Sequence, residues 1–159
     1  MAARRPMKRR RPARGLAALK RKLYRGAIVA AVAVALVAIA FSIRGDRLWR
    51  AIVQVESSGN PRARNPATDA VGIAQITKTL VDDCNRIVGY KRFSYADRWN
   101  VRASREMFDI YLRFWGREYE KETGNRCTDE IRARMWNGGP KGYRLKDTAA
   151  YWNLVKKHL

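Results

Sequence analysis

An uncharged stretch of eighteen residues, Gly26 to Ile43, limits the folds open to this chain more than any other feature. Arg25 and Arg44 bound it on either side. As a helix it would be about 27 Å long, close to the ~30 Å hydrocarbon core of a bilayer. We therefore expect residues 26–43 to form a single transmembrane helix that is retained as a signal-anchor. The alternatives are a buried helix of a soluble fold, or a signal peptide cleaved near Ala38–Ile39–Ala40.

The residues before this stretch form a basic arm. Residues 1–25 contain eleven Lys or Arg and no acidic residue. Because a basic flank stays on the cytoplasmic side of a membrane, we expect the N-terminus in the cytoplasm and residues 46–159 on the exported side. The arm also has the chemistry to bind DNA or anionic lipid headgroups, although setting the topology is the simpler role.

Residues 46–159 are long enough for one compact domain, and their apolar residues recur with helical spacing. Strand-like alternation is scarce. The predicted fold class is therefore mainly α, with at most a small β element between residues 62 and 76. The residues expected to begin or end the helices are Asp46 and Ser57, then Gly89, Gly124, Asp129 and Asn137.

Charge and cysteine content narrow the possible partners and sites. The chain carries a formal charge of +20, and an excess of basic residues remains after the arm is set aside, which suits an anionic polymer as partner. Two Cys and one His cannot supply the four ligands of a structural zinc site, so we expect neither a metal nor a cofactor. Cys84 and Cys127 are candidates for one disulfide in an exported domain, and two buried thiols are the alternative.

Glu56 is the clearest candidate for a catalytic residue in the sequence. It follows Ile52 by four positions and Leu48 by eight, so on a helix it lies near the apolar stripe. Burial there, together with the negative end of the helix dipole, should disfavour the carboxylate and raise its pKa. A carboxylic acid that stays protonated near neutral pH can act as a general acid on a glycosidic oxygen. A solvated or Arg-paired Glu at a helix end is the simpler interpretation.

Four motifs in a fixed order begin at this residue. The runs are Glu56–Pro61 (E-S-S-G-N-P), Gly72–Ile76 (G-I-A-Q-I), Trp136–Pro140 (W-N-G-G-P) and Thr148–Val155 (T-A-A-Y-W-N-L-V). Together they resemble the lytic transglycosylase family related to goose-type lysozyme, in which E-S-x-x-N-P supplies the catalytic Glu and G-L-M-Q-I lines the sugar groove. The chain departs from that pattern at Ala74, where Met is usual, and at Trp136, where Tyr is usual.

The resemblance implies a lysozyme-like fold and assigns roles to particular residues. Glu56 is implied as the catalytic residue. Some of the implied substrate-binding residues also have structural interpretations, because Asn65 suits a turn, Asn137 suits a helix stop and Tyr151 lies on a core face. The residues implied to bind substrate are Ser57, Asn65, Gln75, Asn137 and Tyr151.

The resemblance also implies a reaction. Glu56 would protonate the β-1,4 oxygen between N-acetylmuramic acid and N-acetylglucosamine in peptidoglycan, and would then take the proton of the muramic C6 hydroxyl. The product would be a 1,6-anhydromuramic end. We expect such an enzyme to serve phage entry or host lysis. It would lie at the inner membrane with its catalytic domain in the periplasm, or in a virion membrane if it is a phage particle protein.

Two other functions remain open for residues 46–159 at this stage, besides a nucleic-acid-binding protein led by the basic arm. A hydrolytic lysozyme would need a second carboxylate, for which Asp69 is the best candidate and Asp82 and Asp83 are others. A non-catalytic, membrane-tethered protein that binds or assembles the wall would need no acid at all. The intact Glu56 and Gln75 favour an enzyme, whereas Ala74 and Trp136 favour the binding protein modestly.

Overall fold

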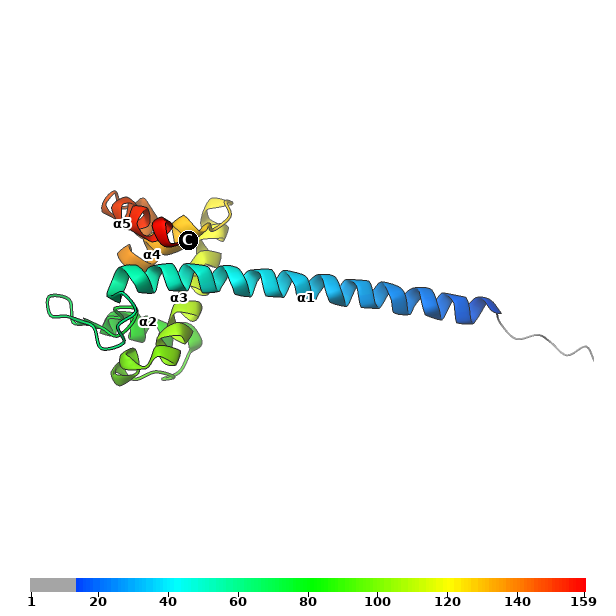
Figure 1. Cartoon of the computed structure of the whole chain (residues 1–159), viewed down its shortest axis with the longest axis horizontal. Coiled ribbons are helices and arrows are strands. Elements are labelled where there is room, and N and C mark those ends of the chain that lie inside the picture. Colours follow the sequence, from blue (N-terminus) through cyan, green and yellow to red (C-terminus); the bar gives the residue numbers. More distant parts are fainter. Residues whose placement is uncertain (1–13) are drawn as a thin grey trace, which may run out of the picture. The chain divides into compact units, whose positions relative to one another are not determined.

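The computed structural model describes the backbone of residues 14–159 and the side chains of residues 20, 22–36 and 46–159 (Figure 1). The chain divides into two compact units, Met1–Ser42 and Ile43–Leu159. Helices dominate, and the described strands form one small sheet. In chain order the elements are α1 (Arg14–Ser57), β1 (Arg64–Asn65), β2 (Ala70–Val71), α2 (Lys78–Val88), η1 (Tyr95–Trp99), α3 (Val101–Thr123), α4 (Asp129–Gly138), η2 (Gly142–Arg144), α5 (Asp147–Val155) and η3 (Lys156–His158).

In the first unit the chain is helical from Arg14 onward. Every described side chain from Lys22 to Leu36 is exposed. Across the described residues, no helix has both the length and the apolar content needed to cross a membrane. That finding does not support the transmembrane helix predicted for residues 26–43. The side chains of residues 37–43 lie outside the described part of the chain. Most of the basic arm, residues 1–25, lies outside them too.

The second unit begins inside the same helix, which corrects the prediction that a new helix starts at Asp46. The backbone is helical through this point. Gly45 makes the helix about 1 kcal/mol less stable there than Ala would. The Asp46 carboxylate caps nothing. It accepts a 2.7 Å hydrogen bond from Nη1 of Arg105 on α3, so it ties α1 to α3.

The core of this unit forms where the last turns of α1 meet α3 and α4. Phe108 lies at its centre, with its ring centroid 5.1 Å from that of Trp49 on α1 and 5.0 Å from that of Trp136 on α4. Arg47 donates to the main-chain carbonyl of Leu159, which brings the last residue against α1. Fully buried members of the core include Ile52, Ile76, Val81, Cys84, Met107, Met135 and Val155.

Local sequence signals set the ends of the helices. Thr77 caps α2 by accepting from the Leu80 amide, and Asn100 and Thr128 cap α3 and α4 in the same way. Gly89 and Gly124 end α2 and α3 in the left-handed conformation that glycine adopts most easily. The predicted helix ends at these two glycines, and the start at Asp129, are therefore confirmed.

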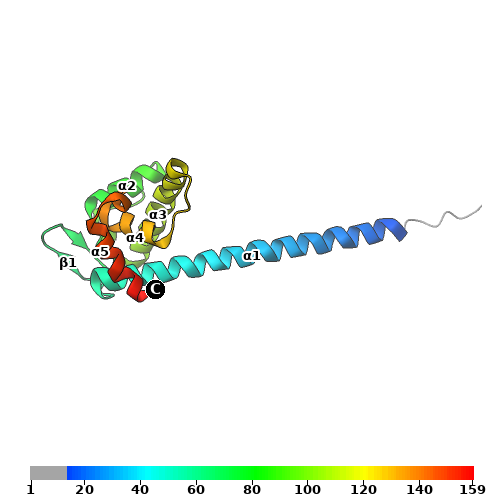
Figure 2. The same cartoon turned by 90° about the horizontal axis from the view of Figure 1, so that it is seen from above.

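A two-stranded antiparallel sheet follows α1, with Arg64 opposite Val71 and Asn65 opposite Ala70 (Figure 2). Val71 also pairs with Ile76, so Gly72–Gln75 forms a tight turn beyond the sheet. This confirms the mainly α fold with a small β element between residues 62 and 76. We call the segment from Arg64 to Ile76 the hairpin segment.

The structure corrects the predicted disulfide, because Cys84 and Cys127 are both buried free thiols. Each cysteine faces a different part of α3. The Cys84 thiol donates to the Met107 carbonyl at 3.5 Å, whereas Cys127 Sγ lies 3.3 Å from where a Cβ on Gly116 would stand. Met107 and Gly116 are about 13 Å apart along the helix, so the two thiols contact α3 at well-separated places.

Candidate active site

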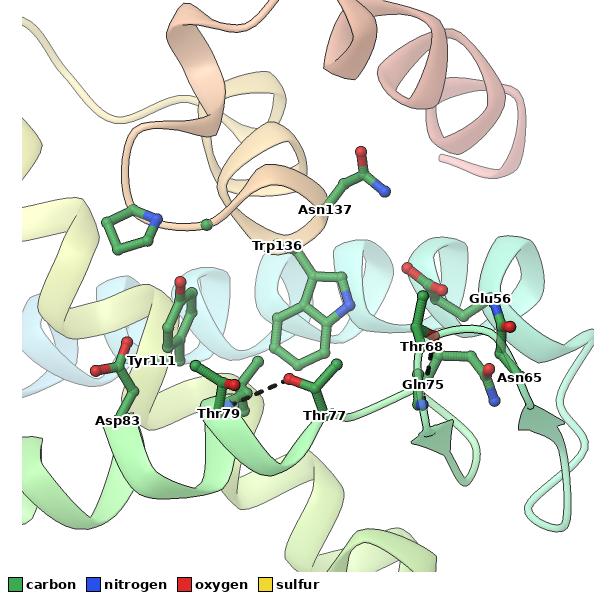
Figure 3. Close-up of a pocket in the computed structure, with 14 residues that line it drawn as sticks. Glu56, Asn65, Thr68, Gln75, Thr77, Thr79, Asp83, Tyr111, Trp136 and Asn137 are labelled. Atoms are coloured by element: carbon green, nitrogen blue, oxygen red, sulfur yellow. Dashed lines mark hydrogen bonds between the residues drawn. The ribbon is translucent and has the colours of Figure 1, made fainter.

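A cleft of about 420 Å³ opens in the second unit (Figure 3). Its size is ordinary for a small-ligand site. In Figure 3, Glu56 lies at one end of the cleft, and Asp83 and Tyr111 lie at the other. One wall comes from the hairpin segment and the start of α2 (Asn65, Thr68, Gln75, Thr77), and the opposite wall comes from the end of α4 (Trp136, Asn137, Gly139, Pro140).

Glu56 stands in the last turn of α1, one residue before the helix ends at Ser57. Its partly buried side chain lines the cleft. Desolvation raises the pKa of the Glu56 carboxyl from its usual 4.5 to about 7, although a hydrogen bond from Tyr151 opposes this shift. Near neutral pH the group is therefore present in both protonation states, which suits a residue that must donate and then accept a proton.

Tyr151 on α5 is the direct partner of this carboxyl group. Its hydroxyl donates to Glu56 Oε1 at 2.7 Å across 95 residues of sequence. Burial is the main reason that the pKa of Tyr151 is raised, and the neighbouring Glu56 raises it further. Tyr151 therefore stays neutral and remains a hydrogen-bond donor to Oε1, whereas Oε2 of Glu56 has no such bond.

Ser57 has a different position from the one expected of a substrate-binding residue. Its hydroxyl donates to the Ile73 carbonyl at 2.6 Å, with a longer contact to the Val53 carbonyl, and the residue is not part of the cleft lining. This bond attaches the turn of the hairpin segment to the end of the helix that carries Glu56. In the structure, Ser57 thus positions the two motifs relative to each other.

Gln75 lies in that turn, in a left-handed conformation with φ of 50°. Its Nε2 donates to the Gly72 carbonyl at 3.0 Å, and the side chain lines the cleft. Gly72 has φ of 78°, and a Cβ there would stand 2.0 Å from the Arg98 carbonyl oxygen. The glycine of this motif is therefore required by both its conformation and its neighbour.

Asn65 and Asn137 line the cleft from opposite walls (Figure 3). Asn65 Oδ1 accepts from the Ala67 amide at 3.0 Å, a turn contact that leaves its amide nitrogen available. Asn137 lies in the last turn of α4, and its exposed carboxamide has no hydrogen-bond partner among the described residues. Their predicted roles in substrate binding stay predictions, but both side chains are placed to reach a ligand.

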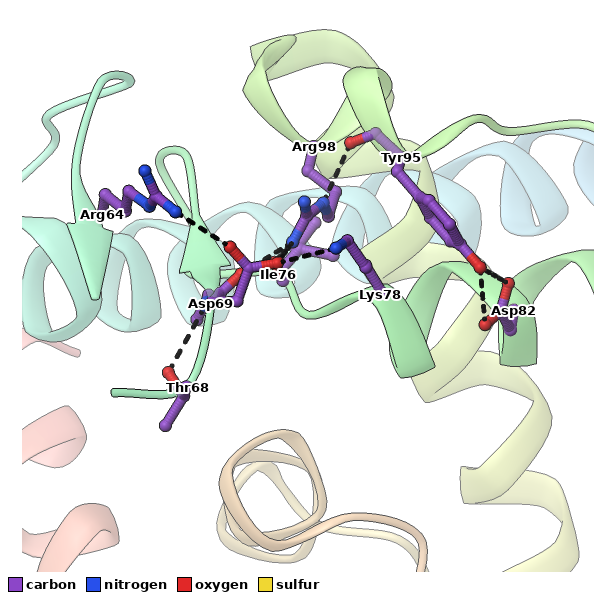
Figure 4. Close-up of polar contacts among 9 residues, drawn as sticks. Arg64, Thr68, Asp69, Ile76, Lys78, Asp82, Tyr95 and Arg98 are labelled. Atoms are coloured by element: carbon purple, nitrogen blue, oxygen red, sulfur yellow. Dashed lines mark hydrogen bonds and ion pairs between the residues drawn. The ribbon is translucent and has the colours of Figure 1, made fainter. Parts of the chain in front are cut away.

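Asp69, the leading candidate for a second carboxylate, does not line the cleft. Its neighbours Thr68 and Ala70 do, whereas Asp69 lies among three basic side chains (Figure 4). Its carboxylate is 3.3 Å from Lys78 Nζ, 3.5 Å from Arg64 Nη2 and 3.6 Å from Arg98 Nη1. The hydrogen bond from Lys78 is the main reason that the pKa of Asp69 is lowered. Asp69 therefore holds the hairpin segment against α2 and η1.

The other two candidates differ from each other. Asp82 accepts from the Tyr95 hydroxyl at 3.1 Å and lies outside the cleft (Figure 4). Asp83 does line the cleft, at the end remote from Glu56, with Trp136 and Thr77 between them (Figure 3). No described group of three or more His, Cys, Asp or Glu side chains is placed to hold a metal ion.

Sequence reasoning missed part of the cleft. Tyr111 lines it from α3, and Thr77 and Thr79 line it from the start of α2. Tyr111 belongs to an ordinary apolar stripe in the sequence, so its contact with the cleft follows only from the packing of α3 against α4. The helix-cap pattern around Thr77 was the one signal available for the start of α2.

Comparisons with known proteins bear on the part of the chain that contains Glu56, Asn65 and Gln75. Residues 45–123 match the family described as "Transglycosylase SLT domain". Over 85 residues the chain is 33% identical to a protein named "Lysozyme" from Ostrea edulis. That alignment covers 54% of this chain and 57% of the relative, so the chain spans little more than half the length of that relative. The family match ends before α4 and α5.

Proposed function

We propose that this chain, whose residues 45–123 form a lysozyme-like SLT transglycosylase domain, is a peptidoglycan lytic transglycosylase. Glu56 is its catalytic residue. The substrate bond is the β-1,4 link between N-acetylmuramic acid and N-acetylglucosamine. One observation carries the proposal: a carboxyl group with a pKa of about 7 stands alone at its end of a cleft, held by a tyrosine that stays neutral.

The reaction needs one acid that later acts as a base. Because Tyr151 occupies Oε1, the transferable proton of Glu56 resides on Oε2. That proton passes to the glycosidic oxygen as the bond to the muramic C1 breaks. The resulting carboxylate then accepts the proton of the muramic C6 hydroxyl, whose oxygen bonds to C1. The protons balance, no water is consumed, and Glu56 ends protonated as it began.

A transglycosylase is favoured over a hydrolase by the positions of the carboxylates. A hydrolase of either stereochemistry places its second carboxylate across the scissile bond from the acid. Asp69 is held by Lys78 outside the cleft, and Asp83 lies at the far end. Among the described residues that line the cleft, none supplies a second carboxylate beside Glu56.

The test is a digest of purified peptidoglycan by the full chain, with Glu56→Gln as the inactive control. Mass spectrometry separates the two chemistries, because anhydromuramic ends are about 18 Da lighter than hydrolysed ends. We expect anhydro products from the wild type and none from Glu56→Gln. Reducing ends would establish a hydrolase instead. A folded wild-type chain that releases no product would leave a wall-binding protein as the function.

We also propose that residues 26–43 attach the enzyme to the inner membrane, with residues 46–159 in the periplasm. The support comes from the uncharged stretch, from the basic residues before it, and from the exposure of apolar side chains such as Val29 and Leu36. In a bacterial host, the full chain should sediment with membranes after an alkaline wash, whereas a chain lacking residues 1–43 should not. A full chain recovered in the supernatant would contradict the attachment.

A further inference from the structure

The end of the cleft remote from Glu56 holds two polar groups that the proposed reaction does not use. Asp83 on α2 and Tyr111 on α3 both line it (Figure 3). Asp83 Oδ2 has no hydrogen-bond partner among the described residues, and neither has the Tyr111 hydroxyl. The Oδ2 atom of an ionised Asp83 can accept a hydrogen bond but cannot donate one. The Tyr111 hydroxyl can donate one.

Arg86 holds Asp83 from the side away from the cleft. It donates from Nε at 3.1 Å and from Nη2 at 2.8 Å, and both bonds end on the same oxygen, Oδ1. The Arg86 guanidinium in turn lies 5.6 Å from the ring centroid of Trp115 and 6.0 Å from that of Phe114. Because the arginine packs over these rings and pairs with Oδ1, Oδ2 is left as the free acceptor of Asp83.

Tyr111 is fixed as firmly. Its ring is buried, with its centroid 6.1 Å from that of Trp136 and 6.4 Å from that of Trp115. Burial raises the pKa of Tyr111, and the nearby negative charge of Asp83 raises it further, so the hydroxyl keeps its proton. Tyr111 is one of the residues that line the cleft, at the end where Asp83 lies (Figure 3).

We propose that Asp83 and Tyr111 form a distal subsite that binds the acetamido group of an N-acetylated sugar, away from the bond that Glu56 cleaves. The amide N–H donates to Asp83 Oδ2, and the amide carbonyl accepts from the Tyr111 hydroxyl. An acetamido group offers one donor and one acceptor, which complement the acceptor on Asp83 and the donor on Tyr111. The proposal rests on the proposed function, because it assigns the same cleft to a glycan.

A subsite of this kind makes binding depend on glycan length. A short oligomer that occupies the Glu56 end gains nothing from Asp83, whereas a longer one reaches both ends of the cleft. Binding energy from such a remote contact can also be used to lower the barrier at the reacting bond. A glycan that lacks the amide would leave the carboxylate and hydroxyl desolvated and unpaired, which costs affinity.

The test measures binding in a chain that cannot cleave. The full chain with Glu56→Gln is titrated calorimetrically with N-acetylglucosamine oligomers of increasing length. We expect the longer oligomers to bind more tightly, and Asp83→Ala or Tyr111→Phe to weaken their binding about tenfold while leaving the short oligomers unchanged. Asp82→Ala is the matched control, because its carboxylate is on the same helix but bonds Tyr95 outside the cleft.

Three results would overturn the subsite. One is equal binding of long oligomers by the Asp83→Ala and Asp82→Ala chains. Another is a Glu56→Gln parent that binds long and short oligomers alike. The third is tighter binding of de-N-acetylated oligomers, which would make Asp83 a site for ammonium groups. Tyr111→Phe keeps the ring packing, so it tests the subsite even if Asp83→Ala fails to fold. Anhydro products from the wild type decide the proposed function independently.

Discussion

The burial that suits Glu56 to acid catalysis also lowers the stability of the folded domain. Its pKa is about 7 in the folded chain and near 4.5 when exposed, so the folded state holds the proton over a pH range in which the unfolded state has lost it. The contribution of Glu56 to the free energy of unfolding therefore falls as pH rises from about 4.5 to about 7 and is lowest above that range. A residue that destabilises its own domain at working pH is typical of a functional site.

Replacing Glu56 by Gln should therefore stabilise the domain in alkaline solution. We expect a gain of up to about 3 kcal/mol at pH 8, from a shift of about 2.5 units at ~1.36 kcal/mol each, and no gain at pH 4. Urea unfolding of both chains at the two pH values measures it. A gain that is equal at pH 4 and pH 8 would show that burial of the charge is not the cause.

Tyr151 should control the pH range of activity. Because cleavage begins with protonated Glu56, kcat/KM should decline as pH rises through about 7. Tyr151→Phe removes the hydrogen bond that favours the carboxylate, so the decline should move to higher pH by up to about one unit, with a lower maximum. A pH profile of both chains tests this, and an unmoved decline in the variant would show that Tyr151 acts on the maximal rate alone.

Among the elements, the hairpin segment depends most on close backbone contacts. Gly72→Ala would place a Cβ 2.0 Å from the Arg98 carbonyl oxygen and would also strain a φ of 78°. We expect a loss of more than about 2 kcal/mol in unfolding free energy. Gly89→Ala is the control, with φ of 83° and no atom within 4 Å of the new Cβ, so it should lose only about 1 kcal/mol. Equal losses in the two variants would mean that the contact with Arg98 relaxes freely.

The same segment decides between the two possible reactions. Asp69→Asn weakens the contacts with Lys78 and Arg64, but Arg98 Nη1 still donates to the main-chain carbonyl of residue 69 at 2.7 Å. We expect kcat/KM to fall by less than about tenfold, with anhydro products unchanged. Turnover and product masses measured on one digest show both. A loss as complete as that of Glu56→Gln would restore Asp69 as a second catalytic carboxylate.

Over the whole molecule, the sequence predicts what local chemistry determines. Helix ends at Gly89 and Gly124 follow from the conformation that glycine permits. The β element between residues 62 and 76 is predicted only by its approximate place. The motifs also bring Glu56 together with Gln75 on one cleft, as their order predicts.

What the sequence does not predict depends on contacts between distant elements. The direction of Asp69 is set by Lys78 and Arg98, and neither pattern nor spacing reveals which way a turn residue faces. The separation of Cys84 from Cys127 is set by the places along α3 that each thiol contacts. The entry of Tyr111 into the cleft likewise requires the packed helices.

The contact between Arg47 and the Leu159 carbonyl brings two positions that are 112 residues apart in sequence to one place on the surface of the second unit. Such a unit tolerates circular permutation, because a short linker can join the two positions without stretching the chain. New termini fit at the exposed Asn125, in the turn after α3. Tyr151 and Glu56 would then be joined through η3, the linker and the last turns of α1, so their hydrogen bond would no longer span 95 residues of sequence.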